Sequence, residues 1–587
     1  MSDVEIKEKE IEKEELKMKN KEYDNLTKDL KEDDKYLIDY LDRMKNGGNF
    51  NKDNPYDQKL LKDIQIEFGD KGQYYDISFN NVDEFIKDYQ NTIEDNGKLN
   101  DQNTEYYKNY VEIKEQNELL KNQLNDRSSV VYRNLGLYVD SSNISIVSDK
   151  SQAVIDGKEY YAKSVIEGIV GELKKNIDTS GANAPVLASN MIPVYYDETN
   201  SVWKKSDVSN MDKTNPWYSY NSTGEYKGMW ANAVTVTSTN RATYLNATPG
   251  TTIIMDDINT MWVWIPRFNA VTPSNYNGGT QAKPNAIDVT FVKPNKTAID
   301  AFTFGTKQLS GFWYAKFELS HSTLASSSNS NNLGCTNEAC NNANGIIIKP
   351  NVTSLRRNNV SNFFFASRSM EQTGNSFGFV SSEVDTHMSK NNEWGAVAYL
   401  TQSIYGRCTN STTCSEVGIN NNSGCLTGYG APAGSNTTVT NGTYNTSLGK
   451  DASTTKNIYG IYDMSGGAWE YVMGVFADTN GKPRSGYSSS YNSGFTGMLT
   501  DGTTYTGITF PDSKYYNLYT GSSYTGHALT ETEMWYSDGT DFVDASNPWF
   551  ERGGGYYNST GAGVFNFVID SGDSGAYISS RLVISDK

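Results

Sequence analysis

The stretch that decides the fold is YGIYDMSGGAWEY, residues 459–471. Two adjacent glycines, Gly466 and Gly467, permit a close approach of backbone that a side chain would prevent. The indole of Trp469 is suited to anchor this turn in the interior, and the Glu470 carboxylate is suited to accept from local amides or to bind a cation. The stretch therefore predicts a tight turn with a buried anchor, and we interpret its residues as structural.

Short strands are predicted on both sides of this turn. From Met191 onward, apolar and aromatic runs are separated by Gly, Asn, Ser and Asp, and few long helical patterns occur. The chain holds 40 Tyr and 50 Gly but only 14 Pro, a composition typical of strands, turns and adaptable contact surfaces. We expect an α+β domain of short antiparallel strands over residues 186–587.

Three motifs in this domain occur in the order seen in the formylglycine-generating-enzyme/sulfatase-modifying-factor superfamily. Residues 261–268, MWVWIPRF, resemble its opening strand, and residues 459–471 are similar to its GLYDMSGNVWEW signature. Residues 552–554 and 580–583 are together similar to its closing motif, RGGSW followed by FRLV. The resemblance implies a decorated C-type-lectin fold. The residues that carry it are Trp262, Trp264, Trp469, Glu470, Arg552, Gly553, Gly554 and Arg581.

Within that superfamily the chain resembles the binding branch, which includes the variable proteins of diversity-generating retroelements and phage tropism determinants. Their carboxy-terminal lectin face carries residues recoded by adenine-directed mutagenesis, and residues 549–584 resemble such a face. Tyr would supply rigid amphipathic area there, and Asn, Ser and Asp adaptable hydrogen bonds. An ordinary polar loop surface is the alternative. The candidate ligand-binding residues are Tyr556, Tyr557, Asn558, Ser559, Asn566, Asp570, Asp573, Ser574 and Tyr577.

Catalysis is not expected. Formylglycine-forming relatives need a redox-active cysteine pair near the closing segment, whereas no cysteine follows Cys425. The three histidines, His321, His387 and His527, share no motif with a nucleophile and no metal-ligand spacing, so we interpret each as structural. A carboxylate pair for sugar hydrolysis is the alternative, drawn from Glu531, Glu533, Asp538, Asp541 and Asp544.

Calcium is the one metal that the resemblance suggests, because some relatives in the superfamily bind it. Asp463 and Glu470 are the candidate ligands. The sequence contains no ligand loop of EF-hand type. No other cofactor is expected.

The five cysteines fall into two local groups, Cys335 with Cys340, and Cys408 with Cys414 and Cys425. Disulfides within the groups would close short loops, as suits an extracellular particle, and would leave one thiol over. The alternative is a zinc site held by four of these cysteines. The tight CxxC spacing of such sites is lacking, and no histidine lies near the groups.

The N-terminal part is predicted to attach and oligomerise the chain. A heptad seam with Asn117 at an a-type position indicates a parallel homo-oligomer, with a trimer favoured, whereas a helix packed on its own domain is the alternative. The seam consists of Tyr106, Tyr110, Ile113, Asn117, Leu120 and Leu124. The predicted segments are 1–60, a charged helical attachment region; 61–99, small and mixed; 100–127, a short coiled coil; and 128–185, a connecting α/β segment with a linker.

The charge of the chain argues against several partners. With 70 acidic and 52 basic residues and a net charge of −18, the molecule would repel nucleic acid and anionic lipid surfaces. The N-terminus shows no secretory signal, and no run of about 18 apolar residues predicts a membrane span. We therefore expect neither nucleic acid binding nor membrane insertion, and we expect release in a virus particle by lysis.

These features together predict a phage tail-fibre or tail-tip receptor-binding protein. It would recognise a bacterial surface glycan or protein, contact other tail proteins through its N-terminal region, and be located in the virion and extracellular after release. The alternatives are a structural baseplate or decoration component without host contact, a bacterial surface adhesin, and a polysaccharide depolymerase.

Overall fold

The computed structural model describes residues 177–209, 213–326 and 332–587, together with five short strands nearer the N-terminus. The chain forms two compact units, Met1–Leu173 and Lys174–Lys587. The predicted attachment region, the mixed segment and the heptad seam lie outside the described residues.

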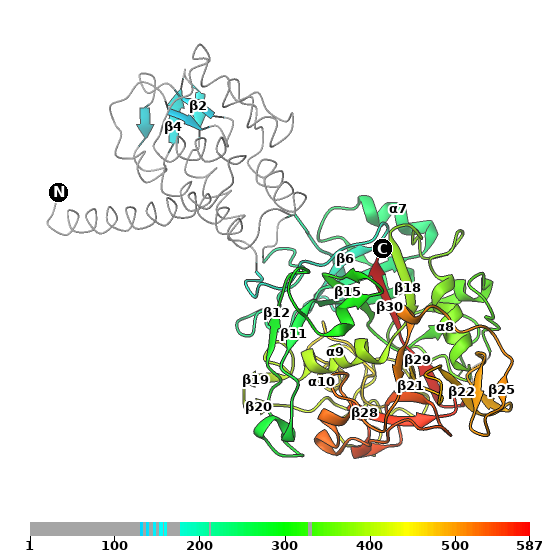
Figure 1. Ribbon diagram of the computed structural model, residues 1–587. Helices are drawn as coiled ribbons and strands as arrows, with labels where there is room; N and C mark the ends of the chain where they lie inside the picture. The colour runs from blue at the N-terminus through cyan, green and yellow to red at the C-terminus, as the bar shows by residue number, and fades with distance from the viewer. Residues whose placement is uncertain are drawn as a thin grey trace, which may run out of the picture. The chain divides into compact units, whose positions relative to one another are not determined.

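The described strands of the first unit form two small antiparallel sheets (Figure 1). One joins β1 (Val130–Tyr132) to β2 (Leu137–Val139). The other joins β3 (Ser145–Val147), β4 (Gln152–Ile155) and β5 (Lys158–Tyr160). All five strands fall within the segment for which an α/β structure is predicted.

An eight-stranded sheet forms the centre of the second unit, in the order β18-β30-β15-β10-β8-β6-β7-β9. All its neighbours pair antiparallel. The C-terminal strand β30 lies inside the sheet, between β15 and β18 (Figure 1). The strands are β6 (Ile192–Asp197), β7 (Val202–Lys205), β8 (Asn232–Val236), β9 (Thr252–Ile253), β10 (Ile258–Pro266), β15 (Gly311–Ala315), β18 (Val384–Met388) and β30 (Leu582–Asp586).

Strand β10 shows why this sheet is interior. It carries the MWVWIP run, and Trp262 and Trp264 are both buried. Trp264 lies opposite Trp313 of β15, and the two rings meet edge to face at 5.3 Å. An almost continuous apolar strand is buried on both faces, so β10 is covered on each side by the rest of the domain.

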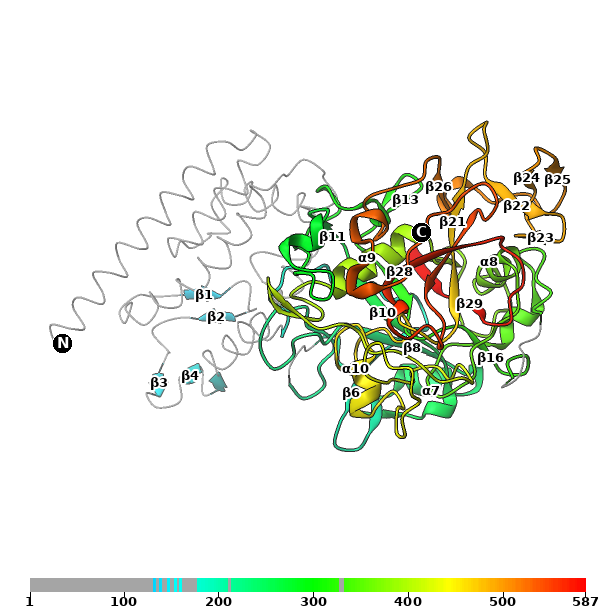
Figure 2. The same cartoon turned by 90° about the horizontal axis from the view of Figure 1, so that it is seen from below.

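A second, mixed sheet carries the C-terminal motifs, in the order β26-β21-β27-β28, with β29 also paired to β21 (Figure 2). β21 pairs parallel with β26 and β29, and antiparallel with β27. The strands are β21 (Trp469–Phe476), β26 (Asn517–Tyr519), β27 (Trp549–Gly553), β28 (Gly563–Asp570) and β29 (Ile578–Ser580).

Smaller sheets and four α-helices complete the described part of this unit. The helices are α7 (Ser238–Asn246), α8 (Val360–Ser369), α9 (Asn391–Thr401) and α10 (Ser447–Asp451). The small sheets are β11 (Phe268–Ala270) with β12 (Val289–Phe291), β13 (Thr303–Phe304) with β14 (Lys307–Gln308), β16 (Ser320–His321) with β17 (Ile346–Ile347), β19 (Cys408–Asn410) with β20 (Thr413–Cys414), and β22 (Arg484–Ser488) with β23 (Tyr491–Asn492), β24 (Gly497–Leu499) and β25 (Thr504–Tyr505).

Helix α9 is buried along its whole length. Its first turn is held by Glu393, whose carboxylate accepts from the Lys390 backbone N–H at 2.8 Å. Trp394 donates from Nε1 to the Val564 carbonyl of β28 at 2.8 Å. The helix therefore connects directly to the second sheet.

The stretch that resembles a linker, residues 180–185, packs on the domain. Asn183 is buried, and its Nδ2 donates to the carbonyls of Val292 and Ser310. Trp264 donates from Nε1 to the Asn183 carbonyl at 3.1 Å. The polar side chains of this stretch are therefore part of the fold.

The second unit consists mostly of short antiparallel strands with few helices, which confirms the predicted class of the domain. Among the residues described, none of the helices combines the length and apolarity needed to cross a membrane.

Candidate binding surface

Three tyrosines form a cluster at the surface of the second sheet. Tyr556 comes from the loop after β27, with Tyr557 beside it, and Tyr577 comes from the loop before β29. Their ring centroids lie 5.1, 5.9 and 5.8 Å apart, all in edge-to-face arrangement. Tyr557 is 53% exposed and Tyr577 44%. We call these three residues the tyrosine surface.

The tyrosine surface is fixed to the turn that decides the fold. Tyr556 donates its backbone N–H to the Gly467 carbonyl at 2.7 Å, and Trp469 donates its backbone N–H to the Tyr577 carbonyl at 2.8 Å. The Trp469 indole N–H donates to the Tyr557 hydroxyl at 3.0 Å. Both loops are therefore held in place by one rigid segment, so ring positions are set before any ligand arrives.

Trp469 differs from its expected role as a buried anchor. It is half-buried, at the edge of β21, and its polar edge meets the exposed hydroxyl of Tyr557. The sequence did not predict this, because a Trp within a motif that resembles a family signature is expected in the core. Its contact with the surface depends on Tyr557, which is distant in sequence.

The two glycines of the turn are required as predicted. Both adopt positive φ, +76° at Gly466 and +80° at Gly467. A Cβ on Gly466 would lie 2.4 Å from the Asn420 carbonyl oxygen, and one on Gly467 would lie 2.2 Å from a Glu318 carboxylate oxygen. Neither contact is sterically allowed, so the turn needs glycine at both positions.

Two other predicted contact residues shape the first loop. The Asn558 side chain accepts from the Gly555 N–H at 2.9 Å, and Ser559 donates from Oγ to the Gly434 carbonyl at 2.6 Å. Both side chains are half-buried. Their polar atoms are engaged within the protein, so these residues position Tyr556 and Tyr557.

The remaining predicted residues divide between interior and surface. Asn566 is only 1% exposed, because its position on β28 faces inward, and its Nδ2 donates to the Gly561 carbonyl. It therefore does not belong to the exposed surface. Asp570 is half-buried and accepts from the Tyr471 hydroxyl. Asp573 is half-buried and Ser574 exposed, both in the loop that carries Tyr577.

An acidic group lies beneath this second loop. Burial raises the pKa of Glu551, and the neighbouring charges of Asp570 and Asp573 raise it further. Burial likewise raises the pKa of each of these two aspartates. The loop therefore rests on carboxyls that hold protons more tightly than usual. The exposed Arg357 lies beside the same loop, because its backbone N–H donates to the Gly575 and Ile578 carbonyls.

The motif residues Glu470 and Arg581 form an ion pair in the interior. Arg581 donates to both carboxylate oxygens of Glu470, at 2.6 and 2.9 Å, and neither side chain is exposed. Arg552, the other motif arginine, is buried and donates to Asn391 Oδ1 and to the Ala528 carbonyl. Arg581 thereby binds β21, whereas Arg552 joins β27 to helix α9 and to the loop at Ala528.

Asp463 and Glu470 do not fit a calcium ion. Both oxygens of Glu470 bind Arg581, and the Asp463 carboxylate accepts from Asn420 Nδ2 and the Gly428 N–H. Calcium would need these oxygens free. In the described ranges, no group of three or more His, Cys, Asp or Glu side chains is arranged to hold a metal ion.

The cysteines follow the prediction of short disulfides. Cys335 is bonded to Cys340, and Cys408 to Cys414, while Cys425 is a buried free thiol. The alternative of a four-cysteine zinc site is therefore wrong.

All three histidines are buried. His387 lies between Asp385 and Glu393, both at 3.1 Å, and His527 contacts Asp300 and the Tyr519 hydroxyl, both at 2.7 Å. His321 Nε2 contacts the Asn342 carbonyl. In the acidic segment, Glu531 and Asp538 are buried, whereas Glu533, Asp541 and Asp544 are exposed.

Comparison with known proteins gives a distant likeness. The sequence matches no protein-family model and no curated protein. The structure is similar to the solved structures of the Major Tropism Determinant U1, P3c and I1 variants, at 14, 13 and 13% sequence identity and TM-scores of 0.22, 0.25 and 0.23. Each alignment covers 76% of this chain and 94% of the other. These TM-scores are too low to support a conclusion about function.

Proposed function

We propose that the chain is a receptor-binding protein of a phage tail that attaches to a bacterial surface molecule through the tyrosine surface. The observation that carries this proposal is the pre-positioned cluster of the exposed Tyr557 and Tyr577 with the half-buried Tyr556. Tyrosine offers a large contact area at low entropic cost, and its hydroxyl can donate or accept a hydrogen bond.

The tyrosine surface favours a ligand with apolar faces. Aromatic rings stack on the apolar faces of sugar rings and on apolar protein side chains. A bacterial glycan or a surface protein offers such faces. We propose binding without a chemical reaction, with no metal or cofactor.

The N-terminal unit would join the domain to other tail proteins and to further copies of the chain, with a trimer favoured. Several copies would turn weak single contacts into stable attachment. The heptad seam over residues 106–124 supports the oligomer. The resemblance of residues 549–584 to phage tropism determinants supports a place in the virion, outside the cell.

The test is binding of the full chain to a panel of bacterial cells, measured by flow cytometry. In the test variant, Tyr556, Tyr557 and Tyr577 are all changed to Ala. The matched control changes Tyr487 and Tyr491, which are 56 and 53% exposed and have no ring contact with the cluster. We expect the wild type and the control to bind, and the test variant to fold but lose binding.

Equal binding by the test variant would refute the tyrosine surface as the receptor site. If the protein is found in virus particles but the chain binds to no cell, the structural virion component is favoured instead.

A further inference from the structure

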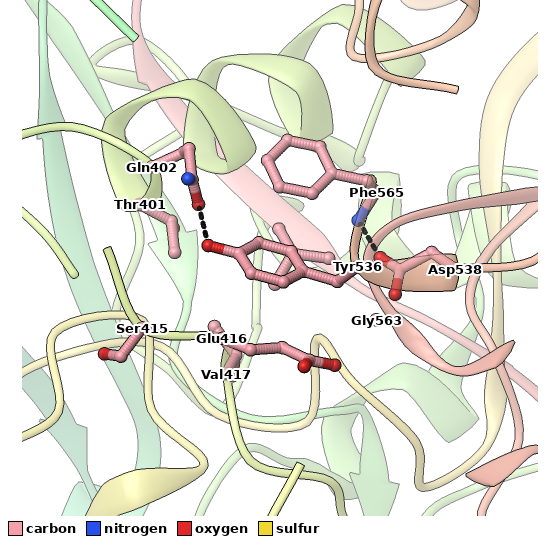
Figure 3. A pocket seen from close by; sticks show the side chains of 10 residues that line it. Thr401, Gln402, Ser415, Glu416, Val417, Tyr536, Asp538, Gly563 and Phe565 are labelled. Carbon is pink, nitrogen blue, oxygen red and sulfur yellow. Dashed lines mark hydrogen bonds between the residues drawn. The ribbon is translucent and has the colours of Figure 1, made fainter. Parts of the chain in front are cut away.

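A small pocket beside β28 contains two carboxylates that the proposed function does not use (Figure 3). Glu416 follows β20, and Asp538 follows the short 3-10 turn Trp535–Ser537. The end of α9 closes another side. The pocket is lined by Thr401, Gln402, Ser415, Glu416, Val417, Tyr536, Asp538, Gly563, Val564 and Phe565.

Asp538 directs an unpaired oxygen into this pocket. It is 1% exposed, and its Oδ2 accepts from the Phe565 N–H at 2.9 Å. Its Oδ1 has no hydrogen-bond partner within the described parts of the chain. Both oxygens lie so close to Gly563 that a Cβ there would be 2.1 Å away. A buried carboxylate with an unsatisfied oxygen is costly unless something binds it.

Glu416 is the second unpaired carboxylate. Figure 3 shows its side chain passing beside the Tyr536 ring, with the carboxylate on the side of the pocket where Asp538 lies. No hydrogen bond or ion pair to this carboxylate is found among the residues described. Burial raises the pKa of Glu416 to about 7, and burial together with the Glu416 charge raises the pKa of Asp538 well above its usual range.

The other charged groups near the pocket are already engaged. Arg407 donates to the backbone carbonyl of Glu416 and to Asp451. Arg552 is buried and binds Asn391 and a backbone carbonyl. Tyr536 remains a neutral phenol, because burial raises its pKa to about 12. Arg407 and Arg552 therefore act on the two carboxylates only through space, and within the described residues the hydrogen bonds that they donate go to other acceptors.

The size and walls of the pocket select the cation. Its free space is about 10 Å³, close to the minimum for one water-sized group. The ring of Tyr536 is fixed by its hydroxyl, which donates to Gln402 Oε1 at 3.1 Å, and Phe565 lines the same space. Aromatic faces attract cations. A guanidinium is too large for this space, and a divalent metal would need more carboxylate or carbonyl ligands.

We propose that this pocket binds a primary ammonium group, with Asp538 Oδ1 and the Glu416 carboxylate as its acceptors. An –NH₃⁺ group has the size of a water molecule and carries three donors. Its source would be a lysine side chain or an amino sugar on a molecule that the domain contacts. The pocket shares no residue with the tyrosine surface, so the inference stands apart from the proposed function.

The experiment is isothermal titration of the full chain with methylammonium chloride near pH 7, in two buffers with different ionisation enthalpies. Binding should release protons, because the cation favours the ionised carboxylates, so the heat should differ between the buffers. Potassium chloride and tetramethylammonium chloride at equal concentration test charge alone. Nα-acetyl-lysine methylamide and glucosamine then compete with methylammonium to distinguish the two sources.

Glu416→Gln and Asp538→Asn should each weaken methylammonium binding roughly tenfold or more, since each removes a charged acceptor. Glu533→Gln is the control, because Glu533 is exposed and outside the pocket. Circular dichroism verifies that each variant folds. If Asp538→Asn does not fold, methylammonium binding by Glu416→Gln tests the proposal, because Glu416 is only half-buried. The proposal is overturned by absent methylammonium binding, by equal binding of potassium or tetramethylammonium, or by unchanged binding in Glu416→Gln.

Discussion

Removing the charge of Glu470 should destabilise the domain strongly. Arg581 places two N–H groups on its carboxylate, at 2.6 and 2.9 Å, and both side chains are fully buried. Glu470→Gln keeps the shape of the side chain but removes the negative charge that receives both N–H groups of the buried Arg581. Removing one partner of a buried pair costs about 3–5 kcal/mol, against a total stability of about 5–15 kcal/mol for a folded domain.

The assay is equilibrium urea unfolding of the full chain, followed by tryptophan fluorescence. Glu225→Gln is the matched control, because the Lys213–Glu225 pair has a similar length, 2.8 Å, but its side chains are 75 and 64% exposed. Exposed pairs contribute little, so the control should unfold like the wild type.

Arg581 also donates to the carbonyls of Ala315 and Tyr462, both at 2.9 Å. Glu470→Gln with Arg581→Met leaves these buried carbonyls without their donor, so the double variant should be no more stable than Glu470→Gln alone. The reasoning is refuted if Glu470→Gln unfolds at the same urea concentration as the control, or if the double variant regains stability.

Three further measurements examine other features. Although burial favours the neutral form of His387, the charge of Glu393 helps to raise its pKa above 6.5. The stability contributed by the charged form is complete below pH 6.5 and is lost as the pH rises through the raised value. His387→Gln should therefore reduce the change of the urea midpoint with pH above 6.5, and an unchanged pH profile would contradict this. Gly467→Ala should lower the free energy of unfolding by more than the backbone strain of about 1–3 kcal/mol that a non-glycine residue meets at positive φ. Gly181→Ala, at φ +79° with no atom close to the added Cβ, should lower it only by that strain. Equal urea midpoints for the two variants would show that the close contact at Gly467 does not matter. Burial raises the pKa of the Cys425 thiol to about 12, so iodoacetamide should label this thiol only after the chain unfolds. Intact-mass measurement detects the label, and rapid labelling of the native chain would argue against the burial of Cys425.

Features that depend on local sequence could be predicted. Gly466 and Gly467 are adjacent, so a turn with close backbone contact was visible in the sequence, and the structure shows the contacts that require it. The disulfide Cys335–Cys340 closes a loop with a sequence separation of only 5. The class of the large domain followed from turn residues that recur between short apolar runs.

Features that depend on distant contacts could not be predicted. Asn566 and Tyr557 are both polar residues of the same C-terminal segment, but one is 1% exposed and the other 53%, because inward and outward positions are set by strand pairing. Glu416 is not among the predicted residues, since its meeting with Asp538 requires the segment after β20 and the turn Trp535–Ser537 to approach in space. The sequence contains no local pattern that joins these two carboxylates.

The interior position of β30 has a consequence for synthesis. This strand lies between β15 and β18 and includes residues that follow the tyrosine surface in sequence. A chain still emerging from the ribosome has already exposed Tyr556 and Tyr577 but lacks the strand that fills the gap in its central sheet. The domain therefore completes its fold only after translation has passed Leu582. A chain that stops in the loops of the tyrosine surface lacks the strand that fills this gap, so its central sheet stays incomplete and open to proteases.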